Sequence, residues 1–150
     1  MSEAPPRPAR PADAPAIRAV GDAAYSRHIP RIGRKPMPME ADYDALVAAG
    51  HVWVMRDGTA VIGVLVLVGE RDHLLLENVC VAPERQRQGI GRRLLAFTED
   101  EARRRGYREV RLYTNVRFIE NIALYRRNGY HETHRGGQDG FERVFMRKVL

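Results

Sequence analysis

The chain has 150 residues, a hydrophobic content of 44%, a charged content of 29% and a formal net charge of +6. This length fits one domain over residues 1–150, and the apolar content excludes a disordered chain. The longest apolar run, AVIGVLVLVG, is only 10 residues long. It is too short to cross a bilayer, so no membrane span is expected.

The cysteine content and the N-terminal segment favour a cytoplasmic protein. The lone Cys80 cannot form an internal disulfide or a thiol-based metal cluster, and the first residues lack the apolar centre of a signal peptide. The basic residues are arginines except for Lys35 and Lys148. Such a surface attracts nucleic acids and phosphorylated small molecules, although a compositional bias on a solvated surface is the simpler interpretation.

The first third of the chain predicts a tail, two helices and a broken loop. Residues 1–8 are expected to form a flexible tail that leads into the short strand RPARP, and Asp13 can cap a first helix reaching about Arg27. The following HIPRIGRKPMPM contains three prolines and a glycine, which predicts an irregular, mobile loop. A short helix over EADYDALVAAG should end at Gly50.

The middle of the chain predicts a three-stranded antiparallel meander. Two β-rich runs meet at Asp57-Gly58, a strong signal for a tight hairpin, and a second turn near Glu70 to Asp72 sends the chain into the strand LLLENVCV. An amphipathic helix should follow Pro83 and end at Gly106.

The last third predicts a strand, a helix and two more strands. REVRLYTN alternates as a strand, RFIENIALYRRNGY suits a helix, and the final strands flank the turn GGQDG. The strand-helix-strand unit over residues 73–114 requires one parallel strand pair within an otherwise antiparallel sheet. The predicted fold class is therefore a mixed α/β sandwich.

The stretch ERQRQGIGRRLL breaks a local rule of helix composition. Arg92 and Arg93 fall in the first turn of a predicted helix, where the partial positive charge of the backbone disfavours cations. Gly89 and Gly91 keep Cβ atoms out of the turn, so successive N–H groups can converge on an anion. A bound diphosphate would reverse the local field and could pair with Arg87 and Arg92. Two glycines alone would also suit a simple tight turn.

Two common phosphate-binding motifs do not fit this stretch. A Walker A loop needs Lys and Ser or Thr after its last glycine, and Gly91 is followed by two arginines. A dinucleotide fingerprint starting at Gly89 would need Gly or Ala where Leu94 stands. Binding of a nucleoside triphosphate, NAD or FAD is therefore not expected.

Two motifs resemble a known family. The run from Gln86 to Gly91, QRQGIG, matches the Q/R-x-x-G-x-G/A signature of the GCN5-related N-acetyltransferase (GNAT) superfamily, and ENIALYRRNGY resembles the family's second motif about 30 residues later. The resemblance implies a twisted, mostly antiparallel sheet of six to seven strands. About four helices would flank the sheet, and its parallel strand pair would splay apart.

The resemblance also implies acetyl-CoA as the acetyl-donor co-substrate, with no metal. Its pyrophosphate would lie on the backbone N–H groups of the turn, and its pantetheine arm would pair with one of the splayed strands. Asn121 would face that arm. The implied contacts are Val79, Cys80, Val81, Gln86, Arg87, Gln88, Gly89, Ile90, Gly91, Arg92 and Asn121.

The implied chemistry is direct attack of an amine on the acetyl carbonyl. Tyr125, one helical turn after Asn121, is the implied proton donor for the leaving thiolate. Because an alkyl amine has a pKa of about 10, it must first lose a proton. Glu77, expected on the same strand face as Val79, is the candidate base through water, and a strand N–H would stabilise the oxyanion. Packing is the alternative role for Tyr125, and a backbone or arginine contact is the alternative for Glu77.

The other reactive side chains receive weaker assignments. Cys80 could accept the acetyl group, but a small residue in a buried strand is more often part of a core. The two histidines of HETH would point to opposite faces of a strand, so a metal site is not expected.

The acceptor is expected to be a primary amine of a small molecule, an amino acid or a peptide. Basic residues in the broken loop would favour an acceptor that carries a carboxylate. Two other functions fit parts of the sequence, an arginine-rich nucleic-acid-binding module and a catalytically inert CoA sensor. The family often forms homodimers. Candidate acceptor contacts are His28, Arg31, Thr114 and Asn115.

Overall fold

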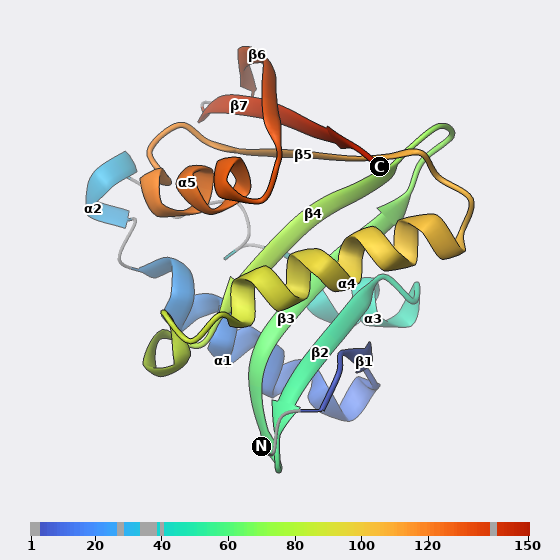
Figure 1. The fold of residues 1–150 in the computed structure, drawn as a ribbon. Coiled ribbons are helices and arrows are strands. Elements are labelled where there is room, and N and C mark those ends of the chain that lie inside the picture. Colours follow the sequence, from blue (N-terminus) through green and yellow to red (C-terminus); the bar gives the residue numbers. More distant parts are fainter. Residues whose placement is uncertain (1–3, 27–28, 34–38, 40, 139–140) are drawn as a thin grey trace.

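The computed structural model describes residues 4–26, 29–33, 39, 41–138 and 141–150. Its strands form one seven-stranded sheet in the order β1-β2-β3-β4-β5-β7-β6 (Figure 1). Every neighbouring pair is antiparallel except β4 and β5. The strands are β1 (Arg7–Pro8), β2 (Val52–Asp57), β3 (Ala60–Gly69), β4 (Leu74–Val81), β5 (Glu109–Asn115), β6 (His131–Gln138) and β7 (Phe141–Val149).

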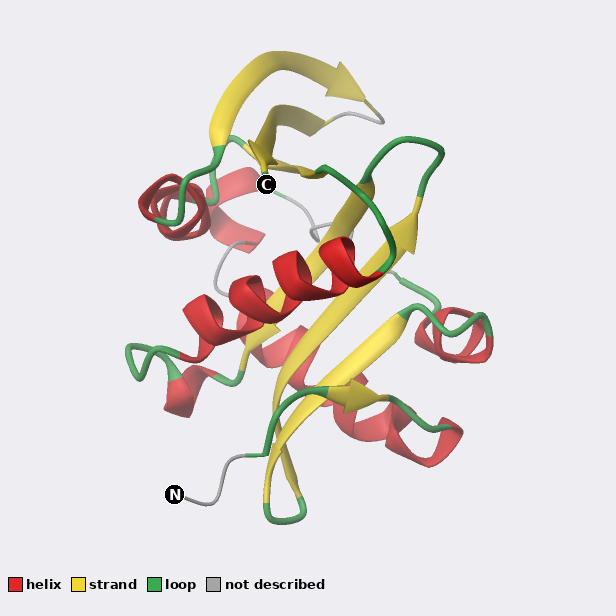
Figure 2. Ribbon diagram, turned by 45° about the vertical axis from the view of Figure 1, so that its right-hand side comes forward, coloured by secondary structure: helices red, strands yellow, loops and turns green. Residues whose placement is uncertain are grey.

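Helices cover both faces of this sheet (Figure 2). Apolar residues of α1 and α3 pack with strand residues in one buried cluster, and those of α4 and α5 pack in a second cluster on the opposite face. The expected mixed α/β fold is confirmed. The helices are α1 (Ala14–Tyr25), α2 (Ile29–Ile32), α3 (Tyr43–Ala48), α4 (Ile90–Arg104) and α5 (Ile119–Arg127), with 3₁₀ turns at Pro11–Asp13 and Pro83–Arg85.

The predicted hairpin and the predicted splay are both present. Asp57 pairs with Ala60 across a two-residue turn in which Gly58 has a φ of 62°. The parallel strands β4 and β5 pair only where Leu74–Leu76 lies beside Val110–Leu112. The second half of β4 therefore has β3 on one side and no strand on the other.

A β-bulge interrupts β4 at the point where the splay begins. Val66 of β3 pairs with Asn78 and Leu67 pairs with Leu76, so Glu77 has no partner in β3. A bulge adds one residue to one strand and shifts the alternation of its side chains. Leu76 and Asn78, which would share a face in a regular strand, therefore lie on opposite faces of the sheet.

Several boundaries differ from those expected. The broken loop contains the one-turn helix α2, in which Pro30 is the second residue, a position where its missing N–H costs nothing. The expected short strand RPARP is present but shorter, since only Arg7 and Pro8 pair with β2, and residues 1–3 lie outside the described ranges. Asp13 accepts hydrogen bonds from Arg7 and from the Arg10 N–H instead of capping α1.

The last turn is shorter than expected, because β6 includes three residues of GGQDG, 136–138. Among the helices of the described ranges, none combines the length and the apolarity needed to span a bilayer.

Candidate active site

The turn between β4 and α4 has the backbone geometry of an anion cradle. Arg87 has a φ of 66° and Gly89 has φ 80° and ψ 7°, so two residues of this short turn are left-handed. Alternation of such residues with ordinary ones brings N–H groups together on a concave surface. Arg93 donates to the Gly89 carbonyl in the first helical hydrogen bond. The N–H groups of Ile90, Gly91 and Arg92 therefore precede the hydrogen-bond ladder of α4 and are available to a ligand.

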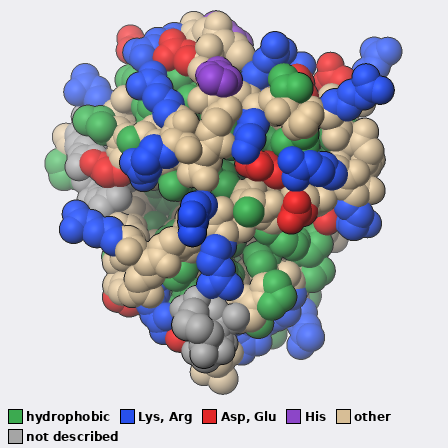
Figure 3. Space-filling view, in the orientation of Figure 1, with side chains coloured by type: hydrophobic (Ala, Val, Ile, Leu, Met, Phe, Trp, Pro, Cys, Tyr) green, Lys and Arg blue, Asp and Glu red, His purple; other side chains and the backbone are tan. Residues whose placement is uncertain are grey.

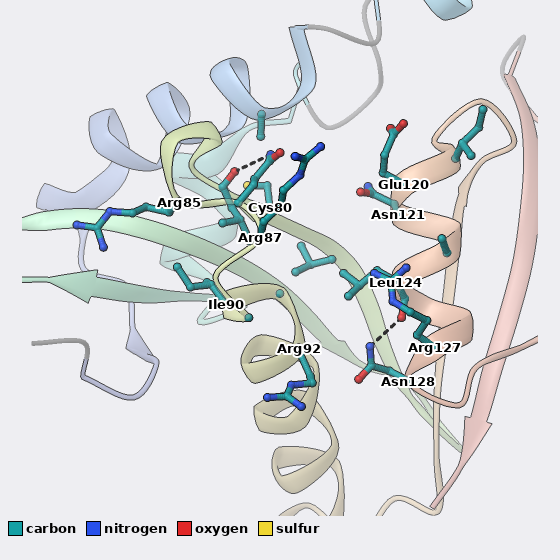
Figure 4. Close-up of a pocket in the computed structure, with 18 of the residues that line it drawn as sticks. Cys80, Arg85, Arg87, Ile90, Arg92, Glu120, Asn121, Leu124, Arg127 and Asn128 are labelled. Carbon is teal, nitrogen blue, oxygen red and sulfur yellow. Dashed lines mark hydrogen bonds between the residues drawn. The ribbon is translucent and has the colours of Figure 1, made fainter. Parts of the chain in front are cut away.

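A cavity of ≈ 750 Å³ opens from this cradle. The turn and the start of α4 form one wall, α5 forms the opposite wall, and the second half of β4 forms the floor (Figure 4). Gly91 allows the two helices to approach, because a Cβ there would lie 3.1 Å from Leu124 Cδ2. The parallel pair thus separates where α4 and α5 enclose a space.

Most of the residues implied as cofactor contacts line this cavity. The exception is Gln88, which is exposed in the same turn and does not line it. Sequence reasoning missed Ala24 and Tyr25 at the end of α1, and also the α5 residues on either side of Asn121. The implied contacts found in the lining are Val79, Cys80, Val81, Gln86, Arg87, Gly89, Ile90, Gly91, Arg92 and Asn121.

Several arginines line the cavity, with Glu120 as the acidic side chain among the lining residues. Arg87 and Arg92 approach from the turn and α4, and Arg127 approaches from α5 (Figure 4). Arg85, which also lines the cavity, bonds to Asp57 at 2.5 Å and so ties the turn to the β2–β3 hairpin. Three exposed guanidinium groups and a row of N–H groups form a strong site for a phosphorylated ligand.

The backbone of β4 offers hydrogen bonds to the cavity. The Ala82 N–H donates to the Ile62 carbonyl of β3, and bonding directions alternate along an antiparallel strand. The backbone groups of Val79 and Val81 therefore point away from β3 and into the gap. Consistent with this direction, the Val79 carbonyl accepts from the Tyr25 hydroxyl at 3.0 Å, and the Val81 carbonyl accepts from Gln86 Nε2 at 3.4 Å.

Tyr125 lies in the second half of α5 and is buried. It is 5% exposed, belongs to the core cluster with Ile122 and is not among the lining residues. Burial, followed by the nearby Cys80 thiol, raises the pKa of Tyr125 above its usual value. Its hydroxyl is therefore neutral at physiological pH, and the raised pKa also makes it a weaker acid than an exposed tyrosine.

The expected face of Glu77 is wrong. Val79 packs in the cluster beneath α4 and α5, but the bulge at Glu77 breaks the two-residue periodicity that was expected to place both on one face. Burial, followed by the charge of Glu77, raises the pKa of Tyr113. Because Leu76 packs in the same cluster as Val79, Glu77, the next residue after Leu76, is assigned to the opposite face of the sheet.

Cys80 is a poor nucleophile in this environment. The side chain is buried, and desolvation raises the pKa of its thiol to about 12. A reactive cysteine needs a stabilised thiolate, so the thiol route is not favoured. Within the described ranges, no group of three His, Cys, Asp or Glu side chains is arranged to hold a metal ion.

The four candidate acceptor residues do not form one observed cluster. His28 lies outside the described residues, and Arg31 is placed only by the backbone of α2. Thr114 is buried in β5, and the Asn115 side chain accepts from the Arg117 N–H at 2.8 Å.

The fold and this site define an acyltransferase of the GNAT type. A family model described as an acetyltransferase (GNAT) domain matches residues 48–132, more than half of the sequence. The chain therefore belongs to the GNAT acetyltransferase family.

Relatives within the family carry several different names. An IAA acetyltransferase from Azospirillum brasilense is 36% identical over 98 residues, which are 63% of this chain and 64% of that protein. The ribosomal protein bS18-alanine N-acetyltransferase of Escherichia coli K12 is 39% identical over 61 residues, 41% of each protein. The matches thus span less than two thirds of either relative.

The fold extends further than these sequence matches. The crystal structure of the PaiA N-acetyltransferase from Thermoplasma acidophilum in complex with coenzyme A has a TM-score of 0.85, covers 100% of both chains and is 17% identical in sequence.

Proposed function

We propose that this protein transfers the acetyl group of acetyl-CoA directly to a primary amine. The observation that carries the proposal is the shape of one cavity, which joins a diphosphate cradle at the start of α4 to an unpaired β4 edge. A diphosphate with an amide-containing arm has matching chemistry at both ends. Family membership and the coenzyme A complex of the Thermoplasma acidophilum protein support the same donor.

Each wall of the cavity would bind a different part of the donor. The N–H groups at the start of α4 would hold the pyrophosphate, with Arg87, Arg92 and Arg127 balancing its charge. The backbone of Val79 and Val81 would hold the pantetheine arm, and Asn121 would face it. The Val81 N–H, which points into the gap, is the proposed donor to the developing oxyanion.

Two side chains would move protons during transfer. Tyr125 would protonate the leaving thiolate, the role that the family motif around it implies. Glu77 would accept the amine proton through water from its position near Tyr113. The base and the phosphate cradle would then act from opposite faces of the sheet, so the amine and the donor enter from different sides.

The arginine surplus does not favour the nucleic-acid alternative. Acidic and basic side chains are interspersed over the face shown in Figure 3. Arg104 and Arg105 both bond to Glu101, and Arg111 and Arg147 both pair with Glu109. A nucleic-acid surface would instead concentrate unopposed cations on one face.

A cytoplasmic location is proposed because the lone Cys80 is suited to a reducing compartment.

The acceptor would be an amine of a small molecule, an amino acid or a peptide. Thiol release from acetyl-CoA across a panel of such amines tests the function. Turnover with at least one amine class is expected. CoA binding by calorimetry, without acetylation of any amine, would support an inert sensor instead, and no CoA binding at all would contradict the proposal.

A further inference from the structure

The β4 edge that faces the gap has lost its neighbouring strand. Beyond Leu76, no residue of β5 pairs with β4, yet the carbonyl of Val79 points into this space. The ladder with β3 holds one side of residues 78–81, but the backbone groups on the side that faces the gap have no strand partner within the described ranges. A side chain that bonds to those groups can add support on the open side of the strand.

A buried tyrosine from α1 provides that support. The Tyr25 hydroxyl shares its one proton between two acceptors, the Val79 carbonyl oxygen at 3.0 Å and Asn78 Oδ1 at 2.6 Å. Its ring packs on Phe118 with the centroids 5.6 Å apart. Tyr25 is only 4% exposed, so its hydroxyl is held from several directions while still bordering the cavity.

Asn78 connects this hydroxyl to helix α3. The Asn78 amide donates to the Tyr43 hydroxyl of α3 at 3.0 Å, and Asn78 and Tyr43 are 8% and 2% exposed. Asn78 also follows the bulge directly, where β4 leaves β5. The side chains of α1, β4 and α3 thus converge on the residue at which the gap begins.

We infer that Tyr25 is a positioning residue for the donor, because it takes the place of the missing strand and holds the Val79 carbonyl ready for the pantetheine arm. The inference rests on the proposed function. A carbonyl oxygen has two lone pairs, so Val79 can accept from Tyr25 and from an amide of the arm together. Tyr25 therefore supports arm binding without having to move aside.

The test compares two probes that differ only in the arm. CoA and adenosine 3′-phosphate 5′-diphosphate share the diphosphate that the cradle would hold. The Kd of the armless probe divided by the Kd of CoA, both measured by calorimetry, therefore isolates the contribution of the arm. In Tyr25→Phe this ratio should fall by about threefold to tenfold, the usual worth of one hydrogen bond. The Kd of the armless probe should stay within twofold of wild type.

Tyr43→Phe is the matched control. It also removes one hydroxyl bonded to Asn78, but Tyr43 does not line the cavity, so its stability should fall while its ratio stays within twofold of wild type. Equal ratios in wild type and Tyr25→Phe, or equal losses in both variants, would overturn the inference and leave the proposed function intact. Failure of wild type to bind CoA would instead overturn the proposed function.

Discussion

The conformation of Gly89 makes a quantitative prediction about the cradle. Its φ of 80° lies in the left-handed region, and a Cβ built there would meet no atom within 4 Å. Gly89→Ala therefore adds no clash, and its cost is the conformational penalty of a left-handed residue, about 1–2 kcal/mol. Because the turn around it is exposed, the free protein can relax locally and avoid that penalty.

Binding of CoA requires the left-handed conformation at residue 89, so the conformational penalty of Gly89→Ala should lower the affinity for CoA. CoA affinity, measured by calorimetry, is expected to fall by about fivefold to thirtyfold, since 1.4 kcal/mol corresponds to a factor of ten. Gly106→Ala is the control, because Gly106 is also left-handed with no atom within 4 Å, but it follows the end of α4 opposite to the cradle, where Gly106 and Tyr107 donate to α4 carbonyls and fix the turn. That variant should lose stability and keep wild-type affinity. CoA affinity of Gly89→Ala within twofold of wild type would refute the reasoning.

Three further predictions concern single side chains. Tyr125→Phe should lower kcat by about 10²-fold or more through loss of the acid. The control Tyr107→Phe, which loses a bond to the Glu70 carbonyl, should keep wild-type kcat. Equal kcat values for Tyr125→Phe and wild type would show that Tyr125 is not the acid. Because desolvation raises the pKa of the Cys80 thiol to about 12, alkylation by iodoacetamide at pH 8 should be slow and Cys80→Ala should retain amine acetylation, and a trapped acetyl-thioenzyme would contradict this. Hydrogen bonds from Arg104 lower the pKa of Glu101, burial raises it, and Arg105 lowers it further, so the pKa in the folded protein lies below its usual value. The ionised Glu101 therefore stabilises the folded protein above the unfolded-state pKa, and this contribution is lost as pH falls through the folded-state pKa. Urea titrations should therefore show Glu101→Gln less stable than wild type at pH 7 by about 1–3 kcal/mol, with the gap narrowing below pH 4.

The parts of the site that are contiguous in sequence could be predicted. The phosphate turn carries its own signals, because Gly89 and the misplaced cations of the first helical turn are local features, and the structure places them at one end of the cavity. The splay was implied by family resemblance, and it is visible in the three-residue pairing of β4 with β5.

The parts that depend on distant residues could not be predicted. Tyr25 and Tyr43 meet Asn78 across 53 and 35 residues of sequence, and no local pattern indicates such contacts. The bulge at Glu77 is equally hidden, since LLLENVCV has no glycine or proline to mark it. One irregular residue was enough to reverse the face of every later side chain in β4.

The narrow join between β4 and β5 has a consequence for how long the protein survives in a cell. Three residue pairs connect the two halves of the sheet, so local opening is expected to start at this seam. A molecule that bridges the seam adds about 2.7 kcal/mol at a hundredfold excess over its Kd. The empty protein should therefore be cut by a protease faster than the protein bound to its donor.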